Sequence, residues 1–308
     1  MLATGEAPAG ERTAETTRED YRRLVKLVGL KPVSVASVEN GSLPGPTGPL
    51  PFRIYAPKPS TNGRQPACVY FHGGTGVFGS IETHDSLCRV IANESGYRVI
   101  SIDYRLAPEH KFPAAVYDCY AATQWVTDHA ERLEIDDTRI AVAGDSAGAT
   151  LAAAVCQLAA ERRQPKIALQ VLLCPVLDVS RKTHSRRAFA SGYFLDATVI
   201  DWALTQLCLP GTDLKDPRLS PIYGRLGAHL PPAQIHTAEF DPFCSEGQIY
   251  ARLLRRAGVS VEYTCHKGML HDFYGMAGAV PSAYRHVLEV AAALKRGLAE
   301  VPDPRQVA

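Results

Sequence analysis

The feature that most constrains the fold is an alternation of short apolar runs with longer helical patterns, which begins at Pro51. The short runs are rich in β-branched residues, as β-strands are, and the longer patterns repeat at helical spacing. Such alternation is typical of parallel βαβ units in a sheet that helices cover on both faces. We therefore predict an α/β fold. The predicted strands are 68–71, 99–102, 140–142, 169–173, 235–239 and 259–265, and the predicted helices are 82–94, 114–132, 147–162, 246–257 and 281–298.

Two segments stand outside this alternation. Residues 14–28 carry apolar side chains at helical spacing and precede Gly29 and Pro32, so they are predicted to form a helix. Residues 180–230 hold a basic run and a helical pattern over 196–209, without a convincing strand. Insertions in α/β sheets commonly sit above the carboxyl ends of the strands, where ligands bind. We therefore expect both segments to form a cap over the functional site.

The predicted domain boundary lies in a segment rich in turn-forming residues. Residues 40–51 contain four prolines and three glycines, a composition that favours a surface loop. The prediction is a cap segment over 1–50, followed by a catalytic domain over 51–308 with a cap insertion at about 180–230.

The net charge excludes polyanionic partners, and two further features of the sequence predict the location of the protein and the state of its cysteines. Thirty-three Lys and Arg residues against 32 Asp and Glu give a formal net charge of +1, which leaves no excess to attract nucleic acid or an anionic membrane surface. Neither a signal peptide nor an apolar span of about 18 residues is apparent, so a cytoplasmic protein is expected. The eight cysteines are scattered singly, which favours reduced, buried thiols.

The most informative motif is the pentapeptide GDSAG at 144–148. The strand pattern RIAVA leads directly into it and an Ala-rich helical pattern follows, which is the context that the G-x-S-x-G motif requires. Its two glycines allow a sharp turn, so that the Ser146 hydroxyl projects at a helix N-terminus. Such a pentapeptide can also be a simple tight turn, but its context favours Ser146 as a nucleophile.

A nucleophilic serine needs a base and an orienting acid, which follow it in this fold in the order Asp or Glu, then His. His271 lies beyond the last predicted strand, in a predicted loop over 267–273, whereas the other downstream histidines lie in strand, helix or cap patterns. Asp241 is the favoured acid because it ends a predicted strand and leaves room for the cap before it. Asp178, at the preceding strand end, is its main alternative.

A glycine-rich loop, HGGTG at 72–76, follows the first predicted strand and offers backbone donors for a substrate oxygen. Because a β-branched residue resists positive φ, Thr75 is expected in an ordinary backbone region. His72 is expected to be structural, since it precedes the serine in the chain. No phosphate-binding motif of the G-K-S/T or G-x-G-x-x-G type occurs in this loop.

Taken together, these residues resemble the hormone-sensitive-lipase-like (family IV) esterases of the α/β-hydrolase superfamily. The resemblance runs from about residue 52 to 298 and includes DYRLAPEH at 103–110, DPRLSP at 216–221 and GMLH at 268–271, besides HGGT and GDSAG. It implies an α/β-hydrolase fold, with a mostly parallel sheet, helices on both faces and a helical cap. It also implies a serine carboxylesterase for small to medium-chain esters, without cofactor or metal. The residues it assigns are Ser146 as nucleophile, His271 as base, Asp241 as orienting acid, and Gly73, Gly74 and Ala147 as oxyanion donors.

The chain departs from the family pattern at one place. The family usually has a third glycine followed by an aromatic residue, where this chain has Thr75 and Gly76. The departure leaves the third donor position open and removes a bulky wall residue.

Three other functions compete with ester hydrolysis. An amidase or peptidase would use the same triad, and a non-catalytic ligand receptor, as in some plant relatives, would lack the catalytic histidine that is present here. A zinc hydrolase using Cys265, His266 and His271 would have a ligand spacing that fits no familiar zinc motif. The expected partner is a small-molecule ester, with neither nucleic acid nor membrane, and a homodimer is one candidate assembly.

Overall fold

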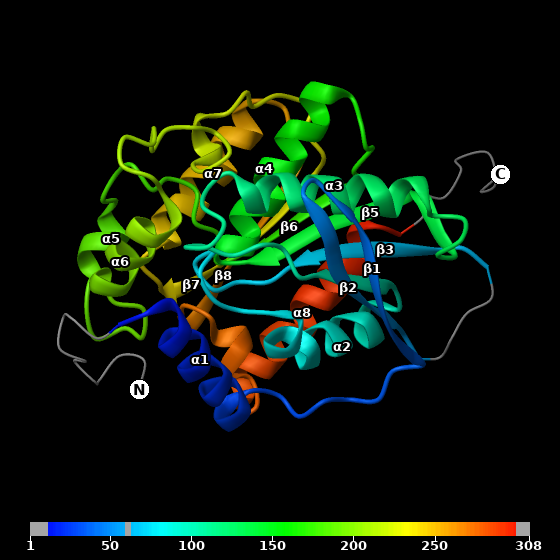
Figure 1. Ribbon diagram of the computed structural model, residues 1–308, viewed down its shortest axis with the longest axis horizontal. Coiled ribbons are helices and arrows are strands. Elements are labelled where there is room, and N and C mark those ends of the chain that lie inside the picture. The colour runs from blue at the N-terminus through cyan, green and yellow to red at the C-terminus, as the bar shows by residue number, and fades with distance from the viewer. Residues whose placement is uncertain (1–11, 59–62, 300–308) are drawn as a thin grey trace.

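An eight-stranded sheet forms the centre of the computed structural model, which describes residues 12–58 and 63–299 (Figure 1). Its strands lie in the order β1-β2-β4-β3-β5-β6-β7-β8. β2 runs antiparallel to both of its neighbours, and all the other adjacent pairs are parallel. The strands are β1 (Ser37–Gly45), β2 (Gly48–Ala56), β3 (Gln65–Phe71), β4 (Arg98–Ile102), β5 (Ile135–Asp145), β6 (Leu169–Leu173), β7 (Ala233–Phe240) and β8 (Val261–Leu270).

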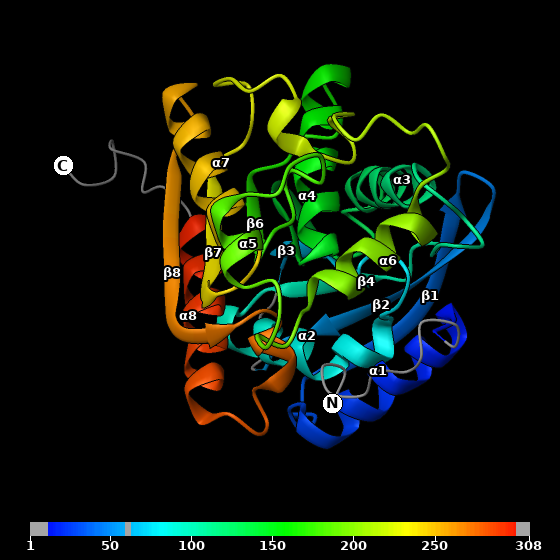
Figure 2. The same ribbon diagram turned by 90° about the vertical axis from the view of Figure 1, so that its left-hand side faces the viewer.

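Helices cover both faces of the sheet, as Figures 1 and 2 show. α3, α4 and α7 lie on one face, and α2 and α8 lie on the other. The predicted α/β class is therefore confirmed. The helices are α1 (Ala14–Val28), α2 (Ile81–Ser95), α3 (Ala114–Asp128), α4 (Ala147–Arg162), α5 (His184–Ala188), α6 (Ala197–Leu207), α7 (Cys244–Arg256) and α8 (Pro281–Gly297), with short 3-10 helices η1 (Pro221–Tyr223) and η2 (Phe273–Met276).

The two faces of the sheet build two separate hydrophobic clusters. Along β3, Val69 and Phe71 enter the cluster under α3 and α4, whereas Cys68 and Tyr70 enter the cluster under α2 and α8. This alternation is the period-two geometry of a strand. Because β3 is buried on both faces, its sequence after Gln65 is continuously apolar rather than alternating.

The surface loop expected over 40–51 is wrong, because β1 and β2 form a hairpin there that belongs to the sheet. Leu43 and Leu50 face each other across the hairpin and are 1% and 3% exposed, so this segment contributes to the core. Its prolines are tolerated because β1 is an edge strand and β2 pairs with β4 only from Phe52 onward. A division of the chain after residue 50 would pass through β2, and residues 1–11 of the predicted cap segment lie outside the described residues.

The last strand is longer than predicted. β8 continues to Leu270, so 267–270 are strand residues rather than loop. A register shift opposite Ala238 and Phe240 and a positive φ of 74° at Gly268 let the strand bend without ending. The local sequence does not reveal this continuation, because it depends on a residue of another strand. The Glu239 carboxylate of β7 accepts hydrogen bonds from Lys267 Nζ and from the Gly268 N–H.

The segment over 180–230 contains α5, α6 and η1, and it lies with α1 at one end of the sheet (Figure 1). The two segments meet in a small apolar cluster that includes Tyr21 of α1 and Ala203 of α6. Val77, which directly follows the glycine-rich loop at 72–76, belongs to the same cluster. Arg18 of α1 also donates to both carboxylate oxygens of Glu109, at 2.8 and 2.7 Å. The N-terminal helix is thus attached to the same end of the sheet as the insertion.

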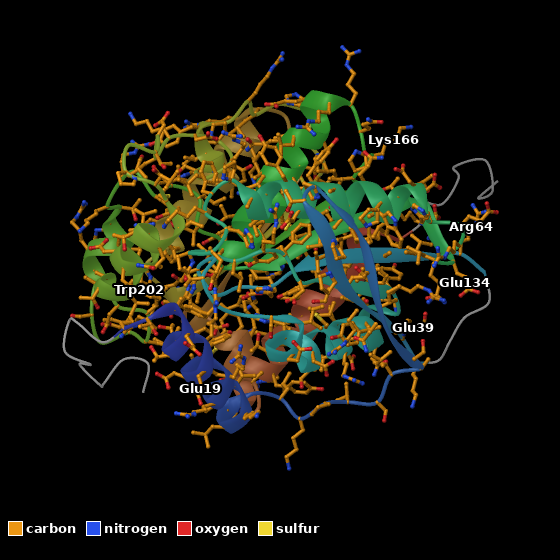
Figure 3. The ribbon with its side chains drawn as sticks, viewed as in Figure 1. Glu19, Glu39, Arg64, Glu134, Lys166 and Trp202 are labelled. Carbon is orange, nitrogen blue, oxygen red and sulfur yellow. The ribbon has the colours of Figure 1, made fainter. Side chains whose placement is uncertain are left out.

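Charged side chains such as Glu19, Arg64 and Lys166 lie on the outside of the molecule (Figure 3). All eight cysteines lie within the described part of the chain; all are free, and seven of them are buried, as predicted. Over residues 12–58 and 63–299, none of the helices has the length and apolar character that crossing a membrane requires.

Candidate functional site

The turn between β5 and α4 presents Ser146 in a strained conformation. Its φ of 52° and ψ of −118° are unusual for a residue with a side chain, and such strain is typical of the nucleophile elbow. A Cβ atom at Gly148 would lie 1.9 Å from the Phe71 carbonyl oxygen, and one at Gly144 would lie 2.4 Å from the Gly148 carbonyl carbon. Both positions require glycine because the turn packs directly against the end of β3.

Three side chains that are distant in the sequence form one hydrogen-bonded chain. The Ser146 Oγ lies 2.9 Å from His271 Nε2, and His271 Nδ1 lies 2.9 Å from Asp241 Oδ2. They follow the carboxyl ends of β5, β8 and β7, and all three are buried. In the tautomer that the carboxylate favours, Nδ1–H donates to Asp241, so Nε2 is free to accept the serine proton. The structure brings together the three residues that the sequence singled out.

Electrostatics in this chain favour a charged imidazole. Burial disfavours the imidazolium, but the adjacent Asp241 carboxylate outweighs burial through its charge and hydrogen bond, so the pKa of His271 is raised above its ordinary value. The other oxygen of Asp241 accepts a hydrogen bond from the Phe243 N–H at 2.7 Å, which holds the carboxylate in place. His271 is therefore poised to accept a proton and to hold it transiently.

The alternative acid, Asp178, has other partners. Its carboxylate accepts hydrogen bonds from Ser180, from Arg181 at 3.0 Å and from Tyr223 at 3.1 Å. These contacts organise the start of the 180–230 segment, and His271 is not among them. Asp178 is therefore a structural residue of this segment.

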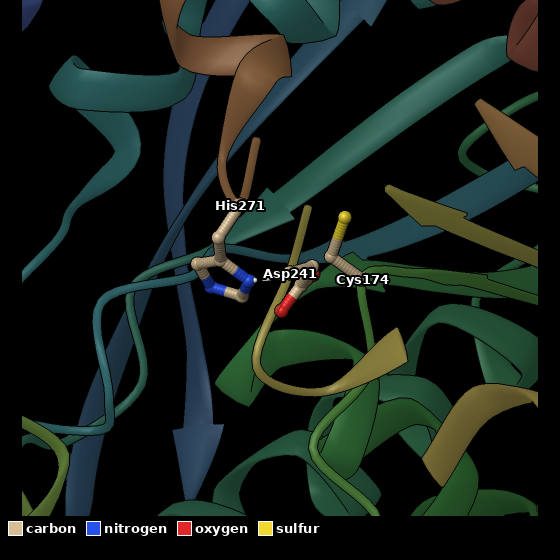
Figure 4. A group of neighbouring side chains, drawn as sticks. All are labelled: Cys174, Asp241 and His271. Carbon is tan, nitrogen blue, oxygen red and sulfur yellow. Dashed lines mark hydrogen bonds and ion pairs between the residues drawn. The ribbon is translucent and has the colours of Figure 1, made fainter. Parts of the chain in front are cut away.

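Cys174 is a neighbour of the hydrogen-bonded chain that the sequence did not reveal. Figure 4 shows its thiol beside Asp241 and His271, and one ligand atom from each of the three lies within 4.8 Å of the others. Burial raises the pKa of this thiol well above its ordinary value, with the charge of Asp241 acting in the same direction. A neutral thiol is a poor metal ligand, and Asp241 and His271 already bind each other.

The structure does not assemble the zinc site considered from sequence. His266 contacts His236 and Glu289, whereas His271 contacts Ser146 and Asp241. Within the described ranges, Cys265 belongs to no group of three potential metal ligands.

The glycine-rich loop is bound to the end of β5 by Asp145. The Gly73 N–H donates to Asp145 Oδ1 at 3.0 Å, and the same oxygen accepts from the Tyr70 hydroxyl at 2.7 Å, while His84 Nε2 lies 3.4 Å from the other oxygen. A Cβ atom at Gly73 would lie 2.0 Å from Asp145 Oδ2. The Gly73 N–H is thus already engaged, and this residue fills a structural role instead of facing a substrate oxygen.

The expectation for Thr75 is wrong, because its φ is 58°. It lies between Gly74 and Gly76, which also have positive φ, and the N–H groups of Val77 and Phe78 both donate to the Gly74 carbonyl. This turn determines the backbone of Thr75 and overrides the preference of its β-branched side chain. Among the described residues, the N–H groups of Gly74, Thr75 and Ala147 have no acceptor.

His72 is structural, as expected. Its ring is fully buried, stacks on Tyr104 with centroids 4.3 Å apart and bonds the Gly73 carbonyl through Nδ1 at 2.7 Å. Burial lowers the pKa of His72 to about 3, so the ring is neutral at physiological pH.

Two pockets meet at Ser146, and both are also lined by Thr75 and Leu195. The first pocket is mostly apolar, and α6 contributes part of its wall. A Cβ atom at Gly76 would lie 3.1 Å from Leu207 Cδ1, so Leu207 stands where an aromatic residue at position 76 would project. The remaining apolar residues of this wall include Phe112, Val116, Leu151, Leu204, Leu219 and Phe243.

The second pocket is more polar and is lined in part by α1. Tyr21 of α1 donates a hydrogen bond to Asp272 at 3.2 Å, directly beside His271. Burial raises the pKa of Asp272 to about 6, and the nearby charge of Asp145 acts in the same direction. The N-terminal helix therefore contacts the turn that carries His271 and Asp272. No local sequence motif predicts this contact.

Comparison with known proteins shows the family to which the chain belongs. A family profile described as the alpha/beta hydrolase fold matches residues 68–275. The chain is 41% identical over 266 residues to the carboxylic ester hydrolase LipN of Mycobacterium tuberculosis, an alignment that covers 84% of this chain and 70% of that protein. It is 40% identical over 253 residues to an ethyl acetate hydrolase of Pseudomonas putida, covering 81% of this chain and 79% of the relative.

Solved structures are similar over nearly the whole chain. An ester hydrolase from the metagenome of Lake Arreo superposes with a TM-score of 0.90 at 40% identity, covering 92% of this chain and 90% of that one. A hyperthermophilic esterase from Pyrobaculum calidifontis superposes with a TM-score of 0.87 at 39% identity, covering 93% of this chain and 92% of that one.

The strain at Thr75 predicts the effect of replacing it. Thr75→Gly should raise the free energy of unfolding by up to about 1 kcal/mol, because glycine adopts positive φ without the steric cost that a β-branched residue bears. Thr75→Ala is the matched control, since it removes the same side-chain atoms beyond Cβ but keeps the unfavourable φ. Thermal unfolding of the two variants measures the difference. A Thr75→Gly variant that is less stable than Thr75→Ala would contradict this account.

The His271–Asp241 contact predicts a titration. In the intact protein the NMR titration of His271 should report a pKa above the ordinary histidine value of about 6.5. In Asp241→Asn the pKa should fall, because the carboxylate that favours the imidazolium is gone and burial then prevails. Asp178→Asn is the control and should leave this titration unchanged. An equal shift in both variants would show that Asp241 is not the dominant partner.

Proposed function

The chain belongs to the α/β-hydrolase family, among its hormone-sensitive-lipase-like carboxylic ester hydrolases, and we propose that it cleaves esters through an acyl-enzyme on Ser146. The observation that carries the proposal is the chain of two 2.9 Å contacts from Ser146 through His271 to Asp241, placed where two pockets meet. A serine held by a base, which is itself held by a buried acid, is the arrangement that activates a hydroxyl.

In the first half of the reaction, the Ser146 oxygen attacks the ester carbonyl carbon while His271 Nε2 takes the hydroxyl proton. Asp241 stabilises the imidazolium without accepting its proton. The tetrahedral intermediate then collapses, the bond to the alcohol oxygen breaks, and the imidazolium returns the proton to the leaving alcohol. In the second half, His271 takes a proton from water as the water attacks the acyl-enzyme carbonyl carbon. This second tetrahedral intermediate collapses, the bond to Ser146 Oγ breaks, the imidazolium returns the proton to that oxygen, and the carboxylic acid leaves.

The negative charge of the tetrahedral intermediate needs backbone donors. We assign this role to the N–H groups of Gly74, Thr75 and Ala147, which have no acceptor among the described residues. Gly73 is not retained as a donor because its N–H binds Asp145. The Ala147 N–H lies in the first turn of α4, where the helix dipole also favours a negative charge.

The proposed substrates are esters with small to medium acyl chains. The first pocket takes the acyl chain, since its wall is mostly apolar and Leu207 of α6 narrows it beside Gly76. The more polar second pocket takes the alcohol side. The relative that is named an ethyl acetate hydrolase supports a short acyl group.

The cap over these pockets is proposed to consist of α1 together with the 180–230 segment. α6 lines the first pocket, and Thr17 and Tyr21 of α1 line the second, so both segments separate the serine from solvent. The cytoplasmic location and the homodimer expected from sequence stay predictions.

Covalent labelling tests the acyl-enzyme. A fluorophosphonate should add one label per chain at Ser146, and Ser146→Ala should lose both labelling and ester turnover. Ser180→Ala, at a serine that binds Asp178, is the matched control and should label fully. Intact-mass spectrometry followed by peptide mapping makes the measurement. Stoichiometric labelling of Ser146→Ala would remove the nucleophile assignment.

Substrate profiling tests the pocket assignment. On p-nitrophenyl esters of increasing acyl length, Leu207→Ala should raise kcat/KM for hexanoate relative to acetate several-fold, because the truncation widens the acyl pocket. Leu209→Ala is the control, since Leu209 is 59% exposed and lies outside the pocket. Equal changes for all chain lengths would show that the first pocket does not hold the acyl group. A p-nitroanilide measured in parallel separates esterase from amidase activity.

A further inference from the structure

A second cluster of potential ligands lies apart from the catalytic residues, where β8 passes α8 at the edge of the sheet (Figure 2). It consists of His266 on β8 and of His286 and Glu289 on α8. One ligand atom from each residue lies within 4.8 Å of the other two. None of the three residues lines either pocket at Ser146.

The geometry of the cluster is partly preformed. His286 and Glu289 are three residues apart and therefore share one face of α8. Glu289 Oε2 lies 2.8 Å from His286 Nδ1 and 3.5 Å from His266 Nδ1, and the two imidazole rings are 4.4 Å apart. Two imidazoles and one carboxylate thus converge on the same small volume from a strand and a helix.

Within the described part of the chain, the buried member of the cluster makes no hydrogen bond on the side that faces the carboxylate, where its Nδ1 lies 3.5 Å from Glu289 Oε2. His266 is 1% exposed, and among the described residues its Nδ1 makes no hydrogen bond. A buried ring nitrogen without a hydrogen bond is uncommon. A ligand between His266 Nδ1 and Glu289 would satisfy it.

The opposite nitrogen of His266 is already held. His266 Nε2 lies 3.1 Å from His236 Nδ1, and the two rings stack at 5.3 Å. In the tautomer in which His266 Nε2–H donates to His236, the lone pair of His266 Nδ1 is directed toward the Glu289 carboxylate, and a cation between them would bind both. Metal-bound histidines usually have their second ring nitrogen bonded in this way.

We propose that His266, His286 and Glu289 form a binding site for one divalent transition-metal ion of the Zn²⁺ type. Two imidazoles with one carboxylate suit zinc, nickel or copper, whereas magnesium and calcium prefer sites made of oxygen ligands. Water completes the coordination from the solvent side, since the side chain of Glu289 is 57% exposed. The ion ties β8 to α8 and stabilises the edge of the sheet without taking part in ester cleavage.

Calorimetric titration with ZnCl₂ tests the site on the full chain after treatment with a chelator and its removal. The wild-type protein should bind Zn²⁺ at this site, and its melting temperature should rise with Zn²⁺ but not with Mg²⁺. His286→Gln and Glu289→Gln should each weaken Zn²⁺ binding at least tenfold. His229→Gln, at an exposed histidine outside the cluster, should bind as the wild type does. Co²⁺ bound at the site in place of Zn²⁺ should give the visible absorption of a low-coordinate site with imidazole ligands. This spectrum should be lost in His286→Gln.

Three outcomes would overturn the proposed metal site. Undiminished Zn²⁺ binding in both α8 variants, or no Zn²⁺ binding by a wild-type protein that unfolds cooperatively, would overturn the site. The two variants should melt at the wild-type temperature without metal, because both side chains are partly or largely exposed. Zn²⁺ that inhibits ester turnover equally in the wild type and in His286→Gln, with no other binding, would place the ion at Cys174, Asp241 and His271 and would also overturn the proposal. Repeating the titration with Ser146→Ala keeps the result independent of esterase activity.

Discussion

The close contact between the nucleophile turn and β3 is the constraint on which the rest of the site depends. Gly144 and Gly148 allow the start of α4 to touch the end of β3, where a Cβ at Gly148 would lie 1.9 Å from a backbone oxygen. The glycine-rich loop continues directly from β3, and Asp145 binds its Gly73 N–H. The serine hydroxyl and the N–H groups of the loop are therefore held in register by backbone packing, before any substrate arrives.

The parallel sheet explains why residues so far apart in the chain meet. β5, β7 and β8 all end at the same edge, and Ser146, Asp241 and His271 each follow one of these ends. Each side chain lies at or just beyond a strand end, so the sheet determines its place. The pockets, by contrast, take part of their walls from α1 and α6, which are helices outside the sheet. The hydrogen-bonded chain thus lies at the strand ends of the sheet, whereas part of the pocket walls comes from helices outside it.

Backbone strain is concentrated around Ser146 and its two pockets. Seven described residues other than glycine have positive φ, and four of them, Thr75, Ser146, Phe194 and Asp272, line the pockets. A fifth, Cys174, lies beside Asp241. Such conformations cost on the order of 1–3 kcal/mol each and persist only where surrounding packing enforces them. The well-packed sheet and its two hydrophobic clusters supply that packing.

The sequence by itself determined the α/β class and the helix bounds over 14–28 and 147–162, and it singled out Ser146, His271 and Asp241, the last with Asp178 as its alternative. Periodicity, turn glycines and the order of residues can all be read along the chain. Only the tertiary structure decided four other matters: the hairpin of β1 and β2, the length of β8, the positive φ of Thr75 and the partner of the Gly73 N–H. The φ of Thr75 follows from the turn closed on the Gly74 carbonyl, which the β-branched side chain of Thr75 did not predict. The other three depend on an atom from a distant segment: Leu43 packs in the core, Glu239 binds the extended part of β8, and Asp145 binds the Gly73 N–H. The cluster of His266, His286 and Glu289 belongs to the same class, since no spacing in the chain announces a strand histidine that meets a helix from the next segment. Local patterns record what a segment prefers, but the packing of distant segments decides which preferences are overridden.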